Sequence, residues 1–186
     1  MTAKIPRLEF EDLEPALAEA LKPRVKRLGY LGEFFKCTGH QPAALLSFIE
    51  FTENSKKGLP DRLVELVALT VATAMGNAYE RNQHERLSVR LGFGRDWVQA
   101  VEALDPDSGG ELAEAERVIQ RLVIAMVERS GHGVEPELAA AVDAVGHKRA
   151  IAVMMVVGRY VTHALFVNAL ALSPPVPSIF EDGFAG

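Results

Sequence analysis

The stretch from Leu59 to Gly92 constrains the fold more than any other part of the chain. Between Leu63 and Met75 almost every residue is apolar, so a helix formed there would be apolar on all of its faces. Such a helix has to be buried on every side. Glu65 is the one charged residue inside it. A buried carboxylate either pairs with a partner or keeps its proton, and either condition suits a proton-transfer residue.

A helix break follows this segment and places polar residues at the start of the next helix. Gly76 and Asn77 interrupt the apolar pattern, and Glu80 follows Asn77 three residues later, as in a capping box. Glu80 and His84 are four residues apart, so they lie on the same helical face. The start of a helix carries a partial positive charge and stabilises a carboxylate or an oxyanion. The pattern therefore indicates a candidate acid–base site.

Simpler interpretations of the same residues remain open at this point. Asn77 and Glu80 could form only a helix cap, and Glu80 and His84 could be a solvated surface pair. Glu65 could merely neutralise Arg62, which precedes it by three residues. The presence of all four candidate residues within twenty positions favours the functional interpretation.

These residues resemble the motif of the carboxymuconolactone decarboxylase / alkylhydroperoxidase D superfamily. That family has a glutamate on one helix and a Cys-x-x-Cys-x-x-x-His motif at the start of the next. Here Glu65 precedes Asn77 by twelve residues, the family's spacing, and Asn77 and Glu80 occupy the two cysteine positions. His84 occupies the histidine position. The sequence around Tyr79 is similar to the tyrosine–glutamate version found in the decarboxylase branch.

The resemblance implies an AhpD-like fold and an enzyme that uses no thiols. The one cysteine, Cys37, lies outside the motif, so the thiol peroxidase route of the family, in which one cysteine attacks and another resolves, is not available. The resemblance instead implies a cofactor-free acid–base enzyme, a carboxymuconolactone decarboxylase-like lyase or lactone-processing enzyme, acting on a small carboxylated substrate. Its catalytic residues would be Glu65, Glu80 and His84. The resemblance also implies a homo-oligomer, either a trimer or a hexamer.

Four further residues are candidates for substrate binding: Asn77, Tyr79, Arg159 and His163. Asn77 and the helix start would hold an oxyanion or a carboxylate. Arg159 would bind a substrate carboxylate bidentately if it reaches the pocket. The alternatives are a core histidine for His163, a subunit boundary for Arg159, and simple packing for Tyr79.

The same residues also bear on cofactors and on non-catalytic roles. Glu65, Glu80 and His84 offer ligands for iron, manganese or zinc. However, the helical di-metal motif uses Glu-x-x-His in two copies, and this sequence has neither the spacing nor the second copy. The sequence also lacks nucleotide-binding glycine motifs. We therefore predict no metal and no other cofactor. A Glu/His metal-binding variant and a non-catalytic oligomeric binding or structural protein remain as alternatives.

Composition and pattern favour an all-α bundle of about eight helices in a single domain, residues 1–186. The net charge of −5 argues against nucleic acid, and one cysteine fits a reducing cytoplasm. The apolar segment from Ala150 to Leu172 contains Arg159 and His163, so it predicts a buried helix or a subunit contact and no membrane span. Pro23 predicts a kink or break in the first helix.

Overall fold

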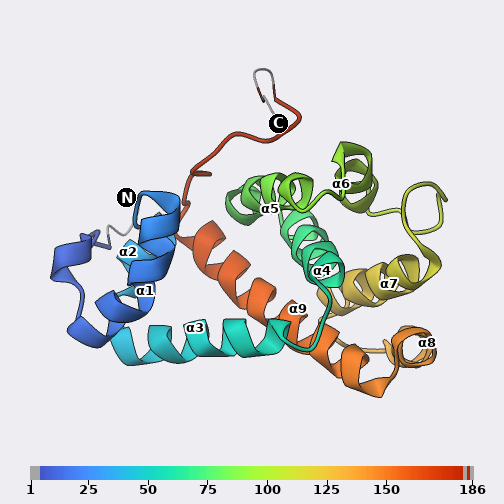
Figure 1. Ribbon diagram of the computed structural model, residues 1–186. Helices are drawn as coiled ribbons and strands as arrows, with labels where there is room; N and C mark the ends of the chain where they lie inside the picture. The colour runs from blue at the N-terminus through green and yellow to red at the C-terminus, as the bar shows by residue number, and fades with distance from the viewer. Residues whose placement is uncertain (1–4, 182–183, 185–186) are drawn as a thin grey trace. The chain divides into compact units, whose positions relative to one another are not determined.

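The computed structural model describes residues 5–181 and 184, and these form helices joined by short loops (Figure 1). Within that described part there is no strand, so the all-α prediction is confirmed. The elements are η1 (Phe10–Asp12), α1 (Pro15–Leu28), α2 (Glu33–Thr38), α3 (Pro42–Lys56), α4 (Asp61–Ala74), α5 (Ala78–Arg90), α6 (Arg95–Glu102), α7 (Glu114–Glu128), α8 (Glu135–Val145) and α9 (His147–Ala169).

The chain divides into two compact units, Met1–Glu53 and Asn54–Gly186. In the first unit, α1 begins with Pro15, whose missing N–H costs nothing in a first helical turn. The helix continues through Pro23 and ends at Gly29, which has a φ of 81°. The helix continues across Pro23, so the break does not occur, because the loss of one backbone hydrogen bond leaves the rest of the helix intact; the kink that was the other expectation stays a prediction. The single-domain organisation stays a prediction.

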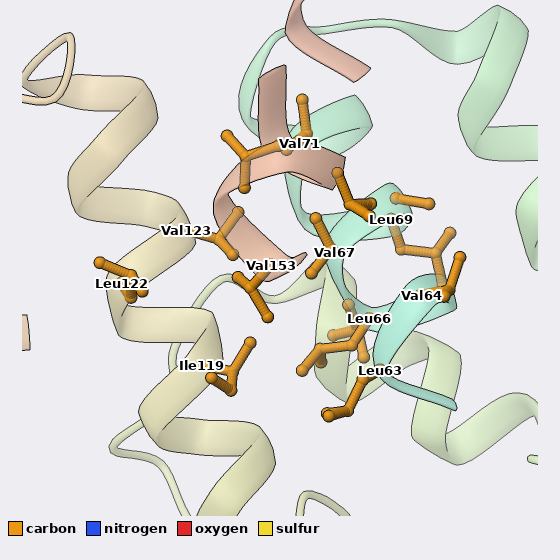
Figure 2. Packing of buried hydrophobic residues seen from close by; sticks show 14 of the residues in the cluster. Leu63, Val64, Leu66, Val67, Leu69, Val71, Ile119, Leu122, Val123 and Val153 are labelled. Atoms are coloured by element: carbon orange, nitrogen blue, oxygen red, sulfur yellow. The ribbon is translucent and has the colours of Figure 1, made fainter. Parts of the chain in front are cut away.

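The second unit is built around α4, which contacts α5, α6, α7 and α9. Every residue of α4 from Leu63 to Ala72 is buried, which confirms the expectation of a helix enclosed on all sides. Figure 2 shows side chains of α4 packed against Val123 of α7 and Val153 of α9. Burying one such leucine or valine side chain stabilises the fold by about 1.5–3 kcal/mol. A polar group between Leu63 and Ala72, such as Glu65, is therefore placed in the core by its apolar neighbours.

The long helix α9 supplies a second wall of this core. It contacts α4, α7 and α8, and its buried side includes Val153 and Tyr160. By length and composition alone α9 could cross a membrane, but half of its most apolar window is buried inside the protein. Its other side exposes Met155, Leu165 and Phe166. One side of α9 thus belongs to the core, as a buried helix in a bundle requires.

The segment after α9 is fastened to a side of α5 by hydrogen bonds. The carboxylate of Glu85 accepts hydrogen bonds from the Ser178 hydroxyl and from the backbone N–H of Ile179, both at 2.7 Å. The amide of Asn82 donates to the carbonyl oxygen of Val176 at 2.9 Å. Glu85 and Ile179 are fully buried. Residues 176–179 therefore hold one side of α5 in place through these hydrogen bonds.

Candidate acid–base site

Glu65 projects from α4 toward α5 and is almost completely buried, with 3% of its surface exposed. Its Oε2 atom lies 2.7 Å from Nδ1 of His84. The Ser88 hydroxyl donates to the same oxygen at a longer distance of 3.5 Å. Arg62 instead donates to Glu116 at 2.6 Å, so the interpretation of Glu65 as a partner for Arg62 is wrong. The carboxylate of α4 is thus committed to the histidine of the next helix.

The turn between α4 and α5 has the geometry that the sequence predicts. Gly76 has a φ of 64°, a left-handed conformation that glycine adopts without strain. Asn77 caps α5, and its side-chain oxygen accepts the backbone N–H of Glu80 at 3.2 Å. The reciprocal half of a capping box does not form, because the side chain of Glu80 points to charged partners in the core. Only the asparagine half of the predicted box is therefore present.

His84 lies between two carboxylates. Its Nδ1 atom faces Glu65 at 2.7 Å, and its Nε2 atom faces Oε2 of Glu80 at 3.0 Å. Glu80 and His84 are one helical turn apart on α5 and both are buried. The interpretation of Glu80 and His84 as a solvated surface pair is wrong for that reason. The three predicted catalytic residues therefore converge on one point.

Helix α9 brings an arginine and a histidine side chain to the other oxygen of Glu80. Arg159 donates from a guanidinium N–H to Oε1 of Glu80 at 3.1 Å. Nε2 of His163 lies 3.0 Å from the same oxygen. Both residues are buried. Arg159 and His163 thus reach the cluster of Glu65 and His84, although their predicted role in substrate binding remains a prediction.

The remaining two predicted binding residues lie beside the cluster. Asn77 is buried and acts as the cap of α5. Tyr79 is also buried, and its ring centroid lies 6.0 Å from that of His163. Their placement agrees with a wall of the site and equally with packing, so their role in binding stays a prediction.

Tyr160 is a member of the cluster that the sequence reasoning did not select. Its hydroxyl lies 3.1 Å from Nε2 of His84, and the two rings meet edge to face with centroids 5.2 Å apart. The guanidinium of Arg159 lies over the Tyr160 ring at 4.2 Å. The available signal was its helical spacing, because positions 159, 160 and 163 share one side of a helix.

The surroundings fix which groups are charged near neutral pH. Burial alone would lower the pKa of His84, but the carboxylates of Glu65 and Glu80 outweigh burial and raise this pKa to about 9. Burial would raise the pKa of Glu80, yet His163, Arg159 and His84 hold it well below its usual value. At pH 7 the cluster therefore contains an imidazolium between two carboxylates. Such a histidine carries the proton that a general acid needs, and its carboxylate neighbours make it a weaker acid than a free imidazolium.

The arrangement suits proton transfer better than metal binding. Both ring nitrogens of His84 are engaged by carboxylates, and Glu80 is held by cations. Over residues 5–181 and 184, no group of three or more His, Cys, Asp or Glu side chains is arranged to hold a metal ion. The predicted absence of a metal stays a prediction. The arrangement is that of a protonated histidine, His84, between the buried carboxylates of Glu65 and Glu80.

Comparisons with known proteins agree with this geometry. Residues 42–121 match the model of the carboxymuconolactone decarboxylase family, and this segment contains Glu65, Asn77, Glu80 and His84. No curated protein sequence shows a significant match. The matched segment therefore carries the motif, whereas Tyr160 and the other α9 residues lie outside it.

Solved structures share the fold at low sequence identity. The debrominase Bmp8, in a structure with 2,3,4-tribromopyrrole, is 17% identical with a TM-score of 0.79, and the match covers 93% of this chain and 92% of that one. Its apo structure matches equally, over 92% of each chain. An AhpD-type antioxidant defence candidate of unknown function from Agrobacterium tumefaciens is 16% identical with a TM-score of 0.69, covering 75% and 96%. These likenesses establish an AhpD-like all-α fold.

Proposed function

We propose that this chain is a cofactor-free acid–base enzyme of the carboxymuconolactone decarboxylase / AhpD-like type, since residues 42–121 match the carboxymuconolactone decarboxylase family model and the fold is AhpD-like. Its substrate is a small carboxylated molecule, and its reaction is decarboxylation or a related lactone-processing step. Thiol peroxidase chemistry of the family type is unsuited to it, since Asn77 and Glu80 stand at the positions of the two cysteines.

The observation that carries this proposal is the buried imidazolium of His84 between Glu65 and Glu80. A buried ion network adds little stability compared with apolar side chains of the same volume. Here the network is surrounded by apolar helices that could have closed over apolar residues instead. Its presence therefore favours a chemical role, and its protonation state favours a proton donor.

In a decarboxylation, the bond between the substrate carbon and its carboxylate carbon breaks and CO₂ leaves. The electron pair stays on the substrate carbon and delocalises into a conjugated carbonyl group. Nε2–H of His84 then delivers its proton to that carbon, and a C–H bond forms. Neutral His84 regains a proton from water, which completes the cycle. Glu65 keeps the ring oriented throughout through Nδ1.

Charged groups around the cluster support a carboxylated substrate. Arg159 and His163 already hold one carboxylate, that of Glu80, at 3.1 and 3.0 Å. A substrate carboxylate offers the same charge and the same acceptor oxygens, so we propose that these two residues bind it. The start of α5, capped by Asn77, would stabilise an oxyanion that develops on the substrate.

The test is a screen of muconolactones, 3-oxo acids and related lactone acids for CO₂ release. Replacement of His84 with Gln should abolish turnover, by about 100-fold or more for loss of a general acid. The same replacement at His132, an exposed residue in a turn, is the matched control and should leave turnover unchanged. Undiminished activity of the folded His84→Gln protein would refute the assignment. Absence of turnover with every substrate would favour the non-catalytic alternative.

The proposed oligomer has its own structural support. Helix α9 exposes Ile151, Met155, Leu165 and Phe166, with between 47% and 59% of each surface accessible. Large apolar side chains that are exposed together on a surface are typical of protein–protein contacts. We therefore propose that copies of this chain associate through α9, as a trimer or a hexamer.

A further inference from the structure

We propose that Tyr160 is a positioning residue that sets the protonation of His84, because its hydroxyl donates a hydrogen bond to Nε2 once that nitrogen has lost its proton. The inference deepens the proposed function and rests on the acid–base role of His84. Its first test, however, needs no substrate, so the two proposals can fail separately.

The argument begins with the two nitrogens of His84. Nδ1 is taken by Glu65 at 2.7 Å, so Nε2 is the nitrogen that exchanges a proton. Nε2 has two neighbours at almost equal distance: Oε2 of Glu80 at 3.0 Å and the hydroxyl of Tyr160 at 3.1 Å. A carboxylate can only accept a hydrogen bond, whereas a phenol can both donate and accept one.

The two neighbours therefore suit different states of the ring. When His84 is an imidazolium, Nε2–H donates to the carboxylate of Glu80. When His84 is neutral, with its proton on Nδ1 facing Glu65, Nε2 carries a lone pair. That lone pair meets only acceptor oxygens on the side of Glu80, and it needs a donor. The Tyr160 O–H group is the donor placed there.

The position of Tyr160 is fixed by its surroundings. Only 1% of its surface is exposed, and its ring meets the His84 ring edge to face. Arg159 lies over the Tyr160 ring at 4.2 Å, and the ammonium group of Lys56 lies 5.7 Å from the ring centroid. The hydroxyl is thereby preorganised beside Nε2, and no rearrangement is needed when the proton leaves.

The neighbours of His84 stabilise different protonation states of its ring. Glu65 and Glu80 stabilise the protonated ring, which is the state before proton donation. Tyr160 stabilises the neutral ring, which is the state after proton donation. A histidine with carboxylate neighbours alone would hold its proton too strongly. The phenol of Tyr160 offsets part of that effect and makes His84 a stronger acid.

The decisive variant is Tyr160→Phe, which removes one oxygen atom and keeps the ring, its contact with His84 and its contact with Arg159. The neutral state of His84 loses its donor, so the pKa of His84 should rise by about 0.5–1 pH unit, the equivalent of one neutral hydrogen bond. Tyr30→Phe makes the same chemical change at an exposed tyrosine and should leave this pKa unchanged.

The measurement is a pH titration of the imidazole nitrogen-15 resonances of the full chain, with His84→Gln used to assign the signal among five histidines. An upward shift in Tyr160→Phe alone supports the inference. An unchanged or lower pKa of His84 overturns it. If turnover is found, kcat of Tyr160→Phe should fall about threefold to tenfold with KM unchanged, and the alkaline limb of the pH profile should move upward. A shifted pKa without any turnover would retain this inference and reject the proposed function.

A second measurement on the unaltered protein covers the case in which Tyr160→Phe does not fold. Tyrosine labelled with carbon-13 at Cζ gives three resonances, one for each tyrosine of the chain. The Tyr160 resonance should move with the titration of His84 near pH 9, because the Tyr160 hydroxyl starts to donate a hydrogen bond to Nε2 when His84 loses its proton. A Tyr160 resonance that ignores the His84 titration would overturn the inference.

Discussion

Replacement of Glu65 with Gln is expected to lower the pKa of His84 and to destabilise the folded protein. The pKa of His84 rises from 6.5 to about 9 in the folded state, which corresponds to about 3 kcal/mol because one pH unit equals about 1.4 kcal/mol. The attraction of Glu65 and its hydrogen bond are the first causes that act against burial. Glu65→Gln should therefore lower this pKa by more than about 1 pH unit.

The stability of the protein should follow the same shift. The folded-state pKa of His84 lies above the unfolded value, so its stabilisation is fully present below pH 6.5 and is lost as the pH rises through about 9. Breaking a buried ion pair by removing one partner costs about 3–5 kcal/mol. We expect a loss of this order at pH 6 for Glu65→Gln, and a smaller loss at pH 10.

Two measurements check the prediction. Denaturant unfolding at pH 6 and pH 10 gives the free energies, and the nitrogen-15 titration gives the pKa of His84. Glu114→Gln, at a carboxylate that is 70% exposed, is the matched control. It should change the free energy of unfolding by no more than about 0.5 kcal/mol and should leave the pKa of His84 unchanged. A Glu65→Gln protein whose His84 still titrates near pH 9 would refute the reasoning, since Glu65 is the carboxylate that faces Nδ1.

Two other predictions follow from features outside the site. Burial and the nearby charge of Glu85 raise the pKa of Glu102 to about 8. The folded state therefore keeps a proton on Glu102 that the unfolded chain loses near pH 4.5. The free energy of unfolding should fall as the pH rises from about 5 to 8. Glu102→Gln should flatten that decline in denaturant unfolding, and an unchanged slope would contradict it. Leu165→Glu on the exposed side of α9 should reduce the oligomer to smaller species in light scattering. A monomeric unaltered chain at micromolar concentration would reject the proposed contact.

The local part of the site was predictable from the sequence for simple reasons. The unbroken apolar run around Glu65 requires burial, and helical spacing places Glu80 and His84 on one face of α5. Gly76 and Asn77 have the residue types that end one helix and cap the next. Each of these inferences depends on residues within about one or two helical turns. The structure agrees with them because tertiary packing does not oppose the local preferences.

The rest of the site depends on how distant helices pack. Tyr160 follows Glu65 by nearly a hundred positions, and only the packing of α9 against α4 brings its hydroxyl to His84. Helical spacing shows that Arg159 and Tyr160 are neighbours, but it does not show which helix they meet. The missing half of the capping box has the same origin. The Glu80 side chain contacts Arg159 and His163 of α9 and does not return to the backbone of α5.

The hydrogen bonds of Glu85 affect the order in which the second unit can mature during synthesis. Ser178 follows Glu85 by 93 residues, so a ribosome has to add that much chain before the Glu85 carboxylate can accept hydrogen bonds from Ser178 and Ile179. Until then the carboxylate of a fully buried glutamate lacks two of its hydrogen bonds. We expect α5, and with it His84, to reach its final position only after residues 176–179 have left the exit tunnel.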